Sequence, residues 1–184
     1  MLKHILILLL VKLPLQILGL PILAIALLFV PRDKEVLPKF LRWFDNYELH
    51  LRDDGDDGLS GPHYIRSKWK DPTGWLARFN WLALRNPVNY FQYKVLGFKT
   101  EGDWAAKVEN PNVGTHSYNV RGVRKTELTN GDGKKYWEYY AVIPLLKSWH
   151  FRARLGYKIG DITDLHDDEW VQWVFSVTPL KKLD

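Results

Sequence analysis

The 184-residue chain contains no cysteine. Disulfide bonds, zinc sites with cysteine ligands and a cysteine nucleophile are therefore excluded. The sequence also lacks the HExxH, P-loop, GxGxxG and GxSxG patterns that accompany common metal-, nucleotide- and serine-dependent activities. Its six histidines are scattered without the spacing of metal ligands. We expect no enzymatic activity, no catalytic residue, no metal and no cofactor.

A strong excess of one charge is also missing. The formal net charge of +5 comes from 26 basic and 21 acidic residues. Two of the basic residues, Lys3 and Lys12, lie in an apolar N-terminal segment, so the rest of the chain is nearly balanced. This surface is not typical of a nucleic-acid-binding protein, and we regard nucleic acid as an unlikely partner.

The first 30 residues are strongly hydrophobic. The stretch from Leu13 to Val30 carries no charge, and at 1.5 Å per residue it would span about 27 Å, close to the hydrocarbon thickness of a bilayer. We predict that residues 1–31 form a transmembrane anchor in contact with the lipid bilayer. Its anchoring side chains are predicted to be Leu13, Leu18, Leu20, Ile22, Leu23, Leu27 and Phe29.

Basic and aromatic residues flank this segment, as at many membrane interfaces. The predicted interface residues are Lys12, Arg32, Lys34, Trp43 and Phe44. Basic residues are more numerous after the segment than before it, which favours a cytoplasmic C-terminal domain. Ala24-Ile25-Ala26 resembles a signal-peptidase site, so cleavage of residues 1–26 is an alternative, as is a buried hairpin in a soluble protein. We prefer an uncleaved anchor because the apolar run continues to Val30.

Residues 32–62 are predicted to form a juxtamembrane amphipathic helix and an acidic loop. The helix covers Pro38 to Leu51, where Phe40, Trp43 and Phe44 fall on one stripe. This stripe either lies on the membrane surface or packs on the following domain. The sequence DDGDDG at residues 53–58 lacks the ligand spacing of an EF-hand and indicates an acidic turn.

Residues 63–184 form an aromatic-rich, mainly β domain in our interpretation. A helical pattern begins at Trp75 and ends near Asn86, after which the hydrophobic period changes to two. Asn130-Gly131-Asp132-Gly133 is a strong hairpin signal. The expected strands cover 91–98, 117–128, 134–143, 149–159 and 170–178. The fold class is therefore α+β: an N-terminal transmembrane helix, one or two short amphipathic helices and an antiparallel meander of about 4–6 strands.

The candidate binding residues lie in two places. On the strand 149–159, His150, Arg152, Arg154 and Lys158 share one face, which we expect to be solvent-facing and neutralised in part by a cross-strand acid such as Glu138. Near Arg85, polar groups among many aromatic rings must find hydrogen-bond partners, a structural role as readily as a functional one. The candidates are Arg85, Asn86, Asn89, Arg152, Arg154 and Lys158. An acidic cluster from Asp161 to Glu169 is interpreted as a solvated turn rather than a metal site.

The order of these features resembles an uncharacterised family of short tailed-bacteriophage proteins. The resemblance rests on the apolar N-terminus, on Trp81-Leu82-Ala83-Leu84-Arg85-Asn86-Pro87-Val88-Asn89-Tyr90-Phe91, on Phe151-Arg152-Ala153-Arg154-Leu155-Gly156-Tyr157-Lys158, and on Val174-Phe175-Ser176-Val177-Thr178-Pro179. It implies a viral origin and a membrane- or virion-associated setting, and it supplies no catalytic residues.

These observations lead to three functional hypotheses. We favour a non-enzymatic single-pass protein of the host inner membrane whose β domain binds an unidentified protein partner. The first alternative is a virion component, structural or ejected, whose apolar helix packs in the particle. The second is a membrane-tethered domain that binds nucleic acid through the basic strand face, with Arg152 and Arg154 on phosphate groups.

Overall fold

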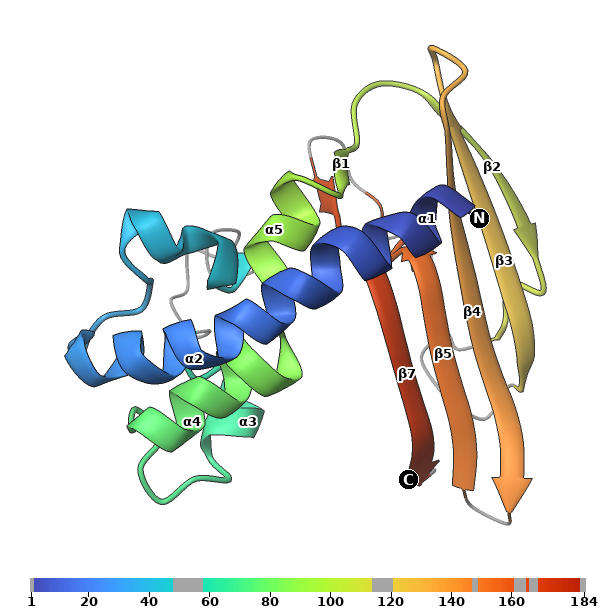
Figure 1. The fold of residues 1–184 in the computed structure, drawn as a ribbon. Coiled ribbons are helices and arrows are strands. Elements are labelled where there is room, and N and C mark those ends of the chain that lie inside the picture. The colour runs from blue at the N-terminus through green and yellow to red at the C-terminus, as the bar shows by residue number, and fades with distance from the viewer. Residues whose placement is uncertain are drawn as a thin grey trace. The chain divides into compact units, whose positions relative to one another are not determined.

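A computed structural model describes residues 2–47, 58–113, 121–146, 149–160, 165 and 169–182. The chain divides between Val95 and Leu96 into an N-terminal helical unit and a C-terminal β unit (Figure 1). The α+β class, the apolar N-terminal helix, the short helices and the antiparallel meander are confirmed.

The helical unit begins with a long apolar helix in three consecutive parts. These are α1 (Leu2–Ile7), a π-helical part η1 (Leu8–Lys12) and α2 (Leu13–Phe29). Pro14 and Pro21 both lie within this continuous helical run, and each lacks the N–H that would donate an intrahelical hydrogen bond. The helix ends at Val30, which is extended because Pro31 follows it.

Short helices complete this unit. They are the 3-10 helix η2 (Lys39–Phe44), α3 (His63–Arg66), α4 (Trp75–Phe79), the π-helical part η4 (Asn80–Arg85) and α5 (Asn89–Lys94). The helical stretch expected from Trp75 to Asn86 is thus confirmed as α4 and η4. By contrast, η2 is shorter and tighter than the amphipathic helix predicted for Pro38–Leu51, whose last four residues lie outside the described part of the chain.

The buried residue Asp45 explains the early end of η2. Its carboxylate accepts hydrogen bonds from the backbone N–H groups of Leu37 and Asn46, at 3.0 and 2.9 Å. Its backbone is extended, with ψ of 164°. One side chain therefore ties together the two ends of the η2 segment and prevents a longer helix.

The predicted strand over residues 91–98 is wrong. Residues Asn89–Lys94 form α5, and only Phe98–Lys99 is extended, as β1. Val88 starts α5 from a left-handed conformation with φ of 56°, and the α5 side chains of Phe91, Gln92 and Tyr93 are all buried. Alternating apolar residues are compatible with a helix that is covered on more than one side, and here the tertiary packing overrides the period-two pattern.

The β unit contains two antiparallel sheets. The short strands β1 and β6 (Trp170–Val171) form one pair. The second sheet has five strands in the order β2-β3-β4-β5-β7, so each strand pairs with the next along the sheet. Its strands are β2 (Trp104–Glu109), β3 (Gly122–Asn130), β4 (Lys135–Leu146), β5 (Trp149–Tyr157) and β7 (Trp173–Lys182).

The hairpin between β3 and β4 is confirmed at the predicted residues. The Asn130 backbone N–H donates to the carbonyl of Lys134 at 3.1 Å, and the Asn130 side-chain oxygen accepts from the Lys134 N–H at 2.8 Å. Gly133 supplies the positive φ, 77°, that this turn needs.

An aromatic core covers one face of the five-stranded sheet. Its buried members are Phe98, Leu128, Tyr136, Ile159 and Val171. The rings of Phe98 and Tyr136 stack with their centroids 3.7 Å apart, and Tyr157 meets Tyr136 edge to face at 5.2 Å. This face is called the core face below, and the opposite one the outer face.

The predicted exposure of the two faces of β5 is wrong. His150, Arg152 and Arg154 lie on the core face, where His150 is fully buried, and Phe151, Ala153 and Leu155 lie on the outer face. Lys158, after Gly156, is exposed as expected. On the neighbouring strand β7, Phe175 and Val177 are 39% and 45% exposed. The alternation of side chains between the two faces of β5 stops at Gly156, whose φ is 91°. As a result, the Tyr157 ring packs against the aromatic core. Alternation places residues on two faces, but it does not say which face is covered.

Candidate functional site

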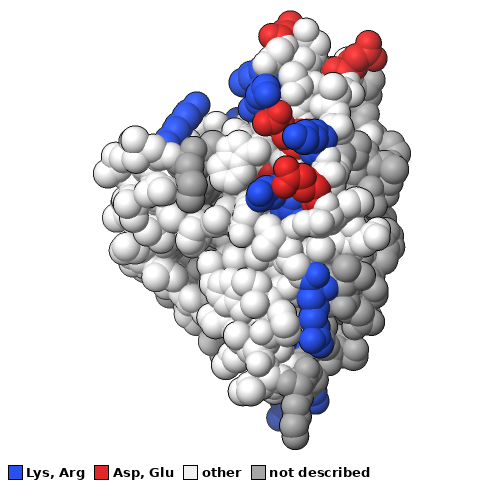
Figure 2. Space-filling view, turned by 90° about the vertical axis from the view of Figure 1, so that its right-hand side faces the viewer, with Lys and Arg blue, Asp and Glu red and all other residues white. Residues whose placement is uncertain are grey.

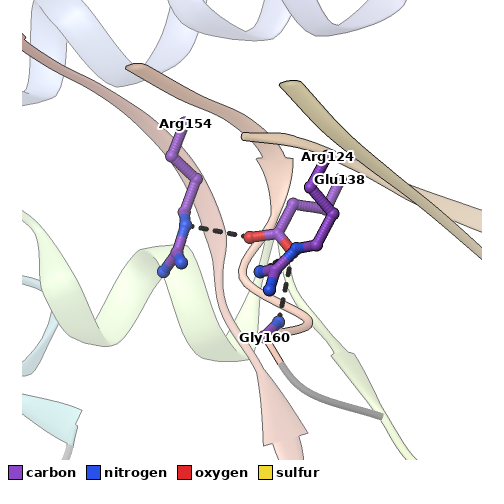
Figure 3. A network of polar contacts seen from close by, with 4 residues as sticks. All are labelled: Arg124, Glu138, Arg154 and Gly160. Carbon is purple, nitrogen blue, oxygen red and sulfur yellow. Dashed lines mark hydrogen bonds and ion pairs between the residues drawn. The ribbon is translucent and has the colours of Figure 1, made fainter. Parts of the chain in front are cut away.

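A buried ionic cluster links three strands on the core face (Figure 3). The Glu138 carboxylate of β4 lies between Arg124 of β3 and Arg154 of β5, at 3.1 and 2.9 Å. The Gly160 N–H donates a further hydrogen bond to the same carboxylate at 3.2 Å. The exposed fractions of the Arg124, Glu138 and Arg154 side chains are 3%, 0% and 20%. This is an ionic cluster in a mostly water-free environment.

Tyr140 supports both cations of this cluster. It lies directly opposite Arg124 on one neighbouring strand and Arg154 on the other. The guanidinium carbons are 5.4 and 4.4 Å from the centre of its ring, within cation–π distance. Arg124, Tyr140 and Arg154 thus form one cross-strand row, and Glu138 joins the two cations from the adjacent row. The arrangement has the geometry of a structural cross-link between strands, and the expectation that Glu138 neutralises the basic residues agrees with it.

His150 lies on the core face of β5, the same face as Arg152 and Arg154. Burial lowers its pKa, and the nearby cations of Arg152 and Lys181 lower it further. A neutral imidazole is the consequence at physiological pH. It adds no charge to the basic residues of this strand.

The six candidate binding residues divide between the two units. Arg154 is held by Glu138, Arg152 is half-buried on the same face, and Lys158 follows Gly156 and is exposed. In the helical unit, Asn89 is buried, and its side-chain oxygen accepts a hydrogen bond from the Tyr47 N–H at 2.7 Å. This contact gives Asn89 a structural role.

The remaining two candidates lie at the end of η4. Arg85 is exposed, and its guanidinium carbon is 5.9 Å from the centre of the Trp81 ring. The Asn86 N–H closes the π-helical turn on the Trp81 carbonyl at 2.8 Å. The side chain of Arg85 therefore remains accessible, while Asn86 is part of the helix end.

The outer face of the sheet has a charged half and an apolar half. On β2, β3 and β4, exposed ion pairs join Lys125 to Glu109 and Lys135 to Glu127. On β4, β5 and β7, cross-strand rows place apolar side chains together; these rows are Tyr139–Leu155–Phe175, Ala141–Ala153–Val177 and Ile143–Phe151. Figure 2 shows charged side chains of both signs gathered in the upper part of the side that faces the viewer; below them most side chains are uncharged, apart from a few Lys or Arg. Exposed apolar surface of this kind is typical of an interaction site.

The end of the apolar helix α2 is joined to α4 by two side chains. The buried guanidinium of Arg78 donates to the carbonyls of Leu27, Val30 and Pro31 at 3.0, 2.9 and 3.2 Å. The indole N–H of Trp75 donates to the Ala24 carbonyl at 2.9 Å. The three carbonyls that Arg78 binds lie at the end of α2, where intrahelical N–H partners are missing. Arg78 therefore caps the C-terminus of α2 with a positive charge.

One stripe of α2 is buried within the helical unit. It consists of Gly19, Leu23 and Leu27, spaced by one helical turn. At Gly19 the Phe44 ring lies so close that a Cβ atom would come within 2.9 Å of it. Leu23 and Leu27, two of the predicted anchoring residues, are buried within the helical unit. The other predicted anchoring residues are exposed, namely Leu13, Leu18, Leu20, Ile22 and Phe29.

The predicted interface residues have different environments. Arg32 pairs with Asp71 at 3.0 Å on the surface, Lys34 is exposed, and Trp43 is half exposed and meets Phe91 edge to face at 5.4 Å. Phe44 is buried against α2, and Lys12 is buried as well. The aromatic stripe of η2 is thus shared: Phe44 packs on protein while Phe40 is exposed.

Sequence reasoning did not single out Arg78, Asp45 or Arg124. The only available signal for Arg78 was a basic residue inside a strongly apolar and aromatic stretch, which requires a partner when buried. Arg124 stands in a mixed, polar stretch that gives no such signal. Within the described residues no group of three or more His, Asp or Glu is placed to hold a metal ion. The acidic turn at 53–57 and most of the acidic cluster after Asp161 lie outside those residues.

Comparison with other proteins identifies a family but no characterised relative. Neither the curated proteins nor the solved structures contain a significant match. A family model matches residues 2–184, almost the whole chain, and its description is a family of unknown function, DUF7338. The uncharacterised status expected from the resemblance is therefore correct at the level of the family. The chain belongs to this family of unknown function.

Proposed function

We propose that this protein is a non-enzymatic single-pass membrane protein whose helical unit holds it in the bilayer and whose β unit binds a protein partner. The observation that carries the proposal is the continuous helix Ile5–Phe29. Its 25 residues exceed the length needed to cross a bilayer, and only 17% of its most apolar window is buried. An apolar helix left uncovered on most sides is stable in lipid and unfavourable in water.

The contacts of α2 support an anchor that is retained rather than cleaved. Cleavage after Ala26 would remove Leu23, which is fully buried, and the Ala24 carbonyl that Trp75 binds. It would also expose the chain end beside Leu27, one of the carbonyls capped by Arg78. The helical unit depends on both sides of the proposed cleavage site.

The charge around the helix supports a cytoplasmic location for the chain after it. Arg32, Lys34, Lys39 and Arg42 follow the helix, whereas Lys3 precedes it. The resemblance to short bacteriophage proteins adds a setting in a host inner membrane. A constant number of copies in purified particles, without recovery from membranes, would instead support a virion component.

The apolar half of the outer face is the surface that we assign to the protein partner. Ile143 on β4 and Phe175 and Val177 on β7, the two strands that flank β5, are each about two-fifths exposed. A partner that covered them would gain the free energy of burying apolar area without disturbing the ion pairs of the charged half. By contrast, Arg154 is engaged by Glu138, which leaves less support for the nucleic-acid alternative.

The absence of native cysteine makes a direct topology test possible. Single cysteines would replace Lys3, before the helix, and Gly131, at the tip of the β3–β4 hairpin, where a side chain has open space. We expect the full chain in the carbonate-washed membrane pellet, with Lys3→Cys labelled by a membrane-impermeant maleimide on intact cells. Gly131→Cys should be labelled only after permeabilisation. Recovery of the full chain in the soluble fraction would refute the anchor.

The partner surface is tested by site-specific photo-crosslinking in cells. A photoreactive amino acid at Phe175 should give a discrete adduct, and one at the exposed residue Lys107 of β2 should not. Equal adduct patterns from both positions, or none from either, would argue against a partner on the apolar half.

A further inference from the structure

The helical unit contains an open groove of about 800 Å³ beside the C-terminal half of α2. One wall is the α2 face formed by Ile22, Ile25, Ala26 and Phe29. The other wall is the segment from Val36 to Leu41. The volume is within the range of small-molecule sites, about 300–1,000 Å³. Most of the lining is aliphatic or aromatic, so an apolar chain would be favoured in it.

Three cations also line this groove. They are Lys34, Lys39 and Arg42. Lys39 and Arg42 are three residues apart in the 3-10 helix η2, so their side chains leave the helix on the same side. Among the described residues none of the three is in an ion pair. Beside Lys34, the acids Asp33 and Glu35 are exposed and do not line the groove, while Arg32 is engaged by Asp71. Arg42 also interacts electrostatically with the Asp45 carboxylate, and its guanidinium carbon lies 5.7 Å from the centre of the Tyr90 ring.

The order of these features along α2 matches that of a lipid in a bilayer. Lys34 follows the helix end at Val30, the level at which a membrane helix reaches the headgroups. Ile22 lies seven residues before Phe29, which corresponds to about 10 Å along the helix axis. The apolar wall therefore runs from the headgroup level into the outer part of the hydrocarbon layer, whose half-thickness is about 15 Å.

From this geometry we propose that the groove binds an anionic phospholipid of the surrounding bilayer. Its acyl chain lies along Ile22, Ile25 and Phe29, and its phosphate-bearing headgroup contacts Lys34, Lys39 and Arg42. A zwitterionic lipid fits the apolar wall equally but leaves the cations without a net negative partner. The assignment rests on the membrane location proposed above. It adds that the protein selects lipids by charge.

The test uses the full chain in mild detergent and native mass spectrometry. Equimolar phosphatidylglycerol and phosphatidylcholine with identical acyl chains would compete for the protein. We expect the first bound lipid to be phosphatidylglycerol by about tenfold or more, since each cation near a lipid surface contributes roughly fivefold. The variant Lys34→Gln/Lys39→Gln/Arg42→Gln should lose this preference.

Two controls distinguish a site from general attraction. Lys68→Gln/Lys70→Gln/Arg85→Gln removes the same charge from exposed positions outside the groove and should keep the preference. Ala26→Trp fills the groove and should lose the first bound lipid, whereas Leu28→Trp, on an exposed part of α2 that does not line it, should not. Near-UV circular dichroism of each variant verifies that the helical unit is folded.

The possible outcomes separate the two proposals. Equal binding of both lipids to the native chain, an equal loss in both triple variants, or an unaffected first lipid in Ala26→Trp would overturn the lipid site. If the chain stays in carbonate-washed membranes, these results leave the membrane anchor intact. Release of the chain to the soluble fraction would instead refute the anchor, whatever lipid it binds in detergent.

Discussion

Replacing Glu138 by glutamine should strongly destabilise the β unit. The substitution keeps the size of the side chain but removes the negative charge that lies between Arg124 and Arg154, at 3.1 and 2.9 Å from them. Removing one partner from a buried ion pair costs about 3–5 kcal/mol, because the remaining charge stays buried without compensation. The glutamine oxygen can still accept one of the three contacts, so we expect a loss of about 3 kcal/mol.

Hydrogen exchange with mass spectrometry measures this loss in the strands concerned. The free energy of opening would be taken from β4 and β5 peptides of the full chain in detergent, as a function of urea concentration. Glu127→Gln is the matched control, because Glu127 pairs with Lys135 on the surface, with side chains 44% and 63% exposed. Such a pair contributes about 0–1 kcal/mol. If the two substitutions differ by less than about 1 kcal/mol, the cluster does not stabilise the sheet as argued.

Three further predictions address the helical unit, one glycine and pH. Arg78→Met should lower the stability of the helical unit by about 2–4 kcal/mol, because three carbonyls at the end of α2 lose a charged donor. Arg85→Met, on the surface, should change this stability by less than about 0.5 kcal/mol. Urea unfolding of the two variants measures the difference. Gly156→Ala should destabilise the sheet by at least about 2 kcal/mol, since φ is 91° and the new Cβ would overlap a carbonyl of the neighbouring strand. Gly131→Ala should be nearly neutral, because the space around Gly131 is open. Equal thermal unfolding midpoints of the two variants would contradict the predicted strain at Gly156. Burial raises the pKa of Asp45 from 3.8 to about 6, so the folded state binds this proton more tightly than the unfolded state. The contribution of this group is therefore fully present below about pH 4 and is lost, by about 3 kcal/mol, as pH rises through 6; Asp45→Asn should remove that slope from urea midpoints measured between pH 4 and 7.

Local chemistry determined several parts of this protein. The charge-free run before Pro31 specifies an apolar helix that ends at Val30, because no polar side chain interrupts it and the proline stops it. Asn130 to Gly133 specify the β3–β4 turn through backbone conformations that few other residues tolerate. Alternation along β3, β4 and β5 specifies strands and, with short connections, an antiparallel meander. Each of these depends on neighbours within a few residues.

Other features were decided only by tertiary contacts. The sequence of β5 offers an apolar and a basic side, and either could face a core. The basic side is the buried one because Glu138 and Tyr140 bring compensating groups to Arg154 from a neighbouring strand, and Gly160 donates a hydrogen bond to the same Glu138 carboxylate. Likewise, α5 is helical where its residues alternate, and Leu23 and Leu27 are buried within the helical unit. Periodicity indicates which residues share a face. Whether that face is buried depends on contacts with residues distant in sequence, and a local sequence pattern carries no information about the free energy of those contacts.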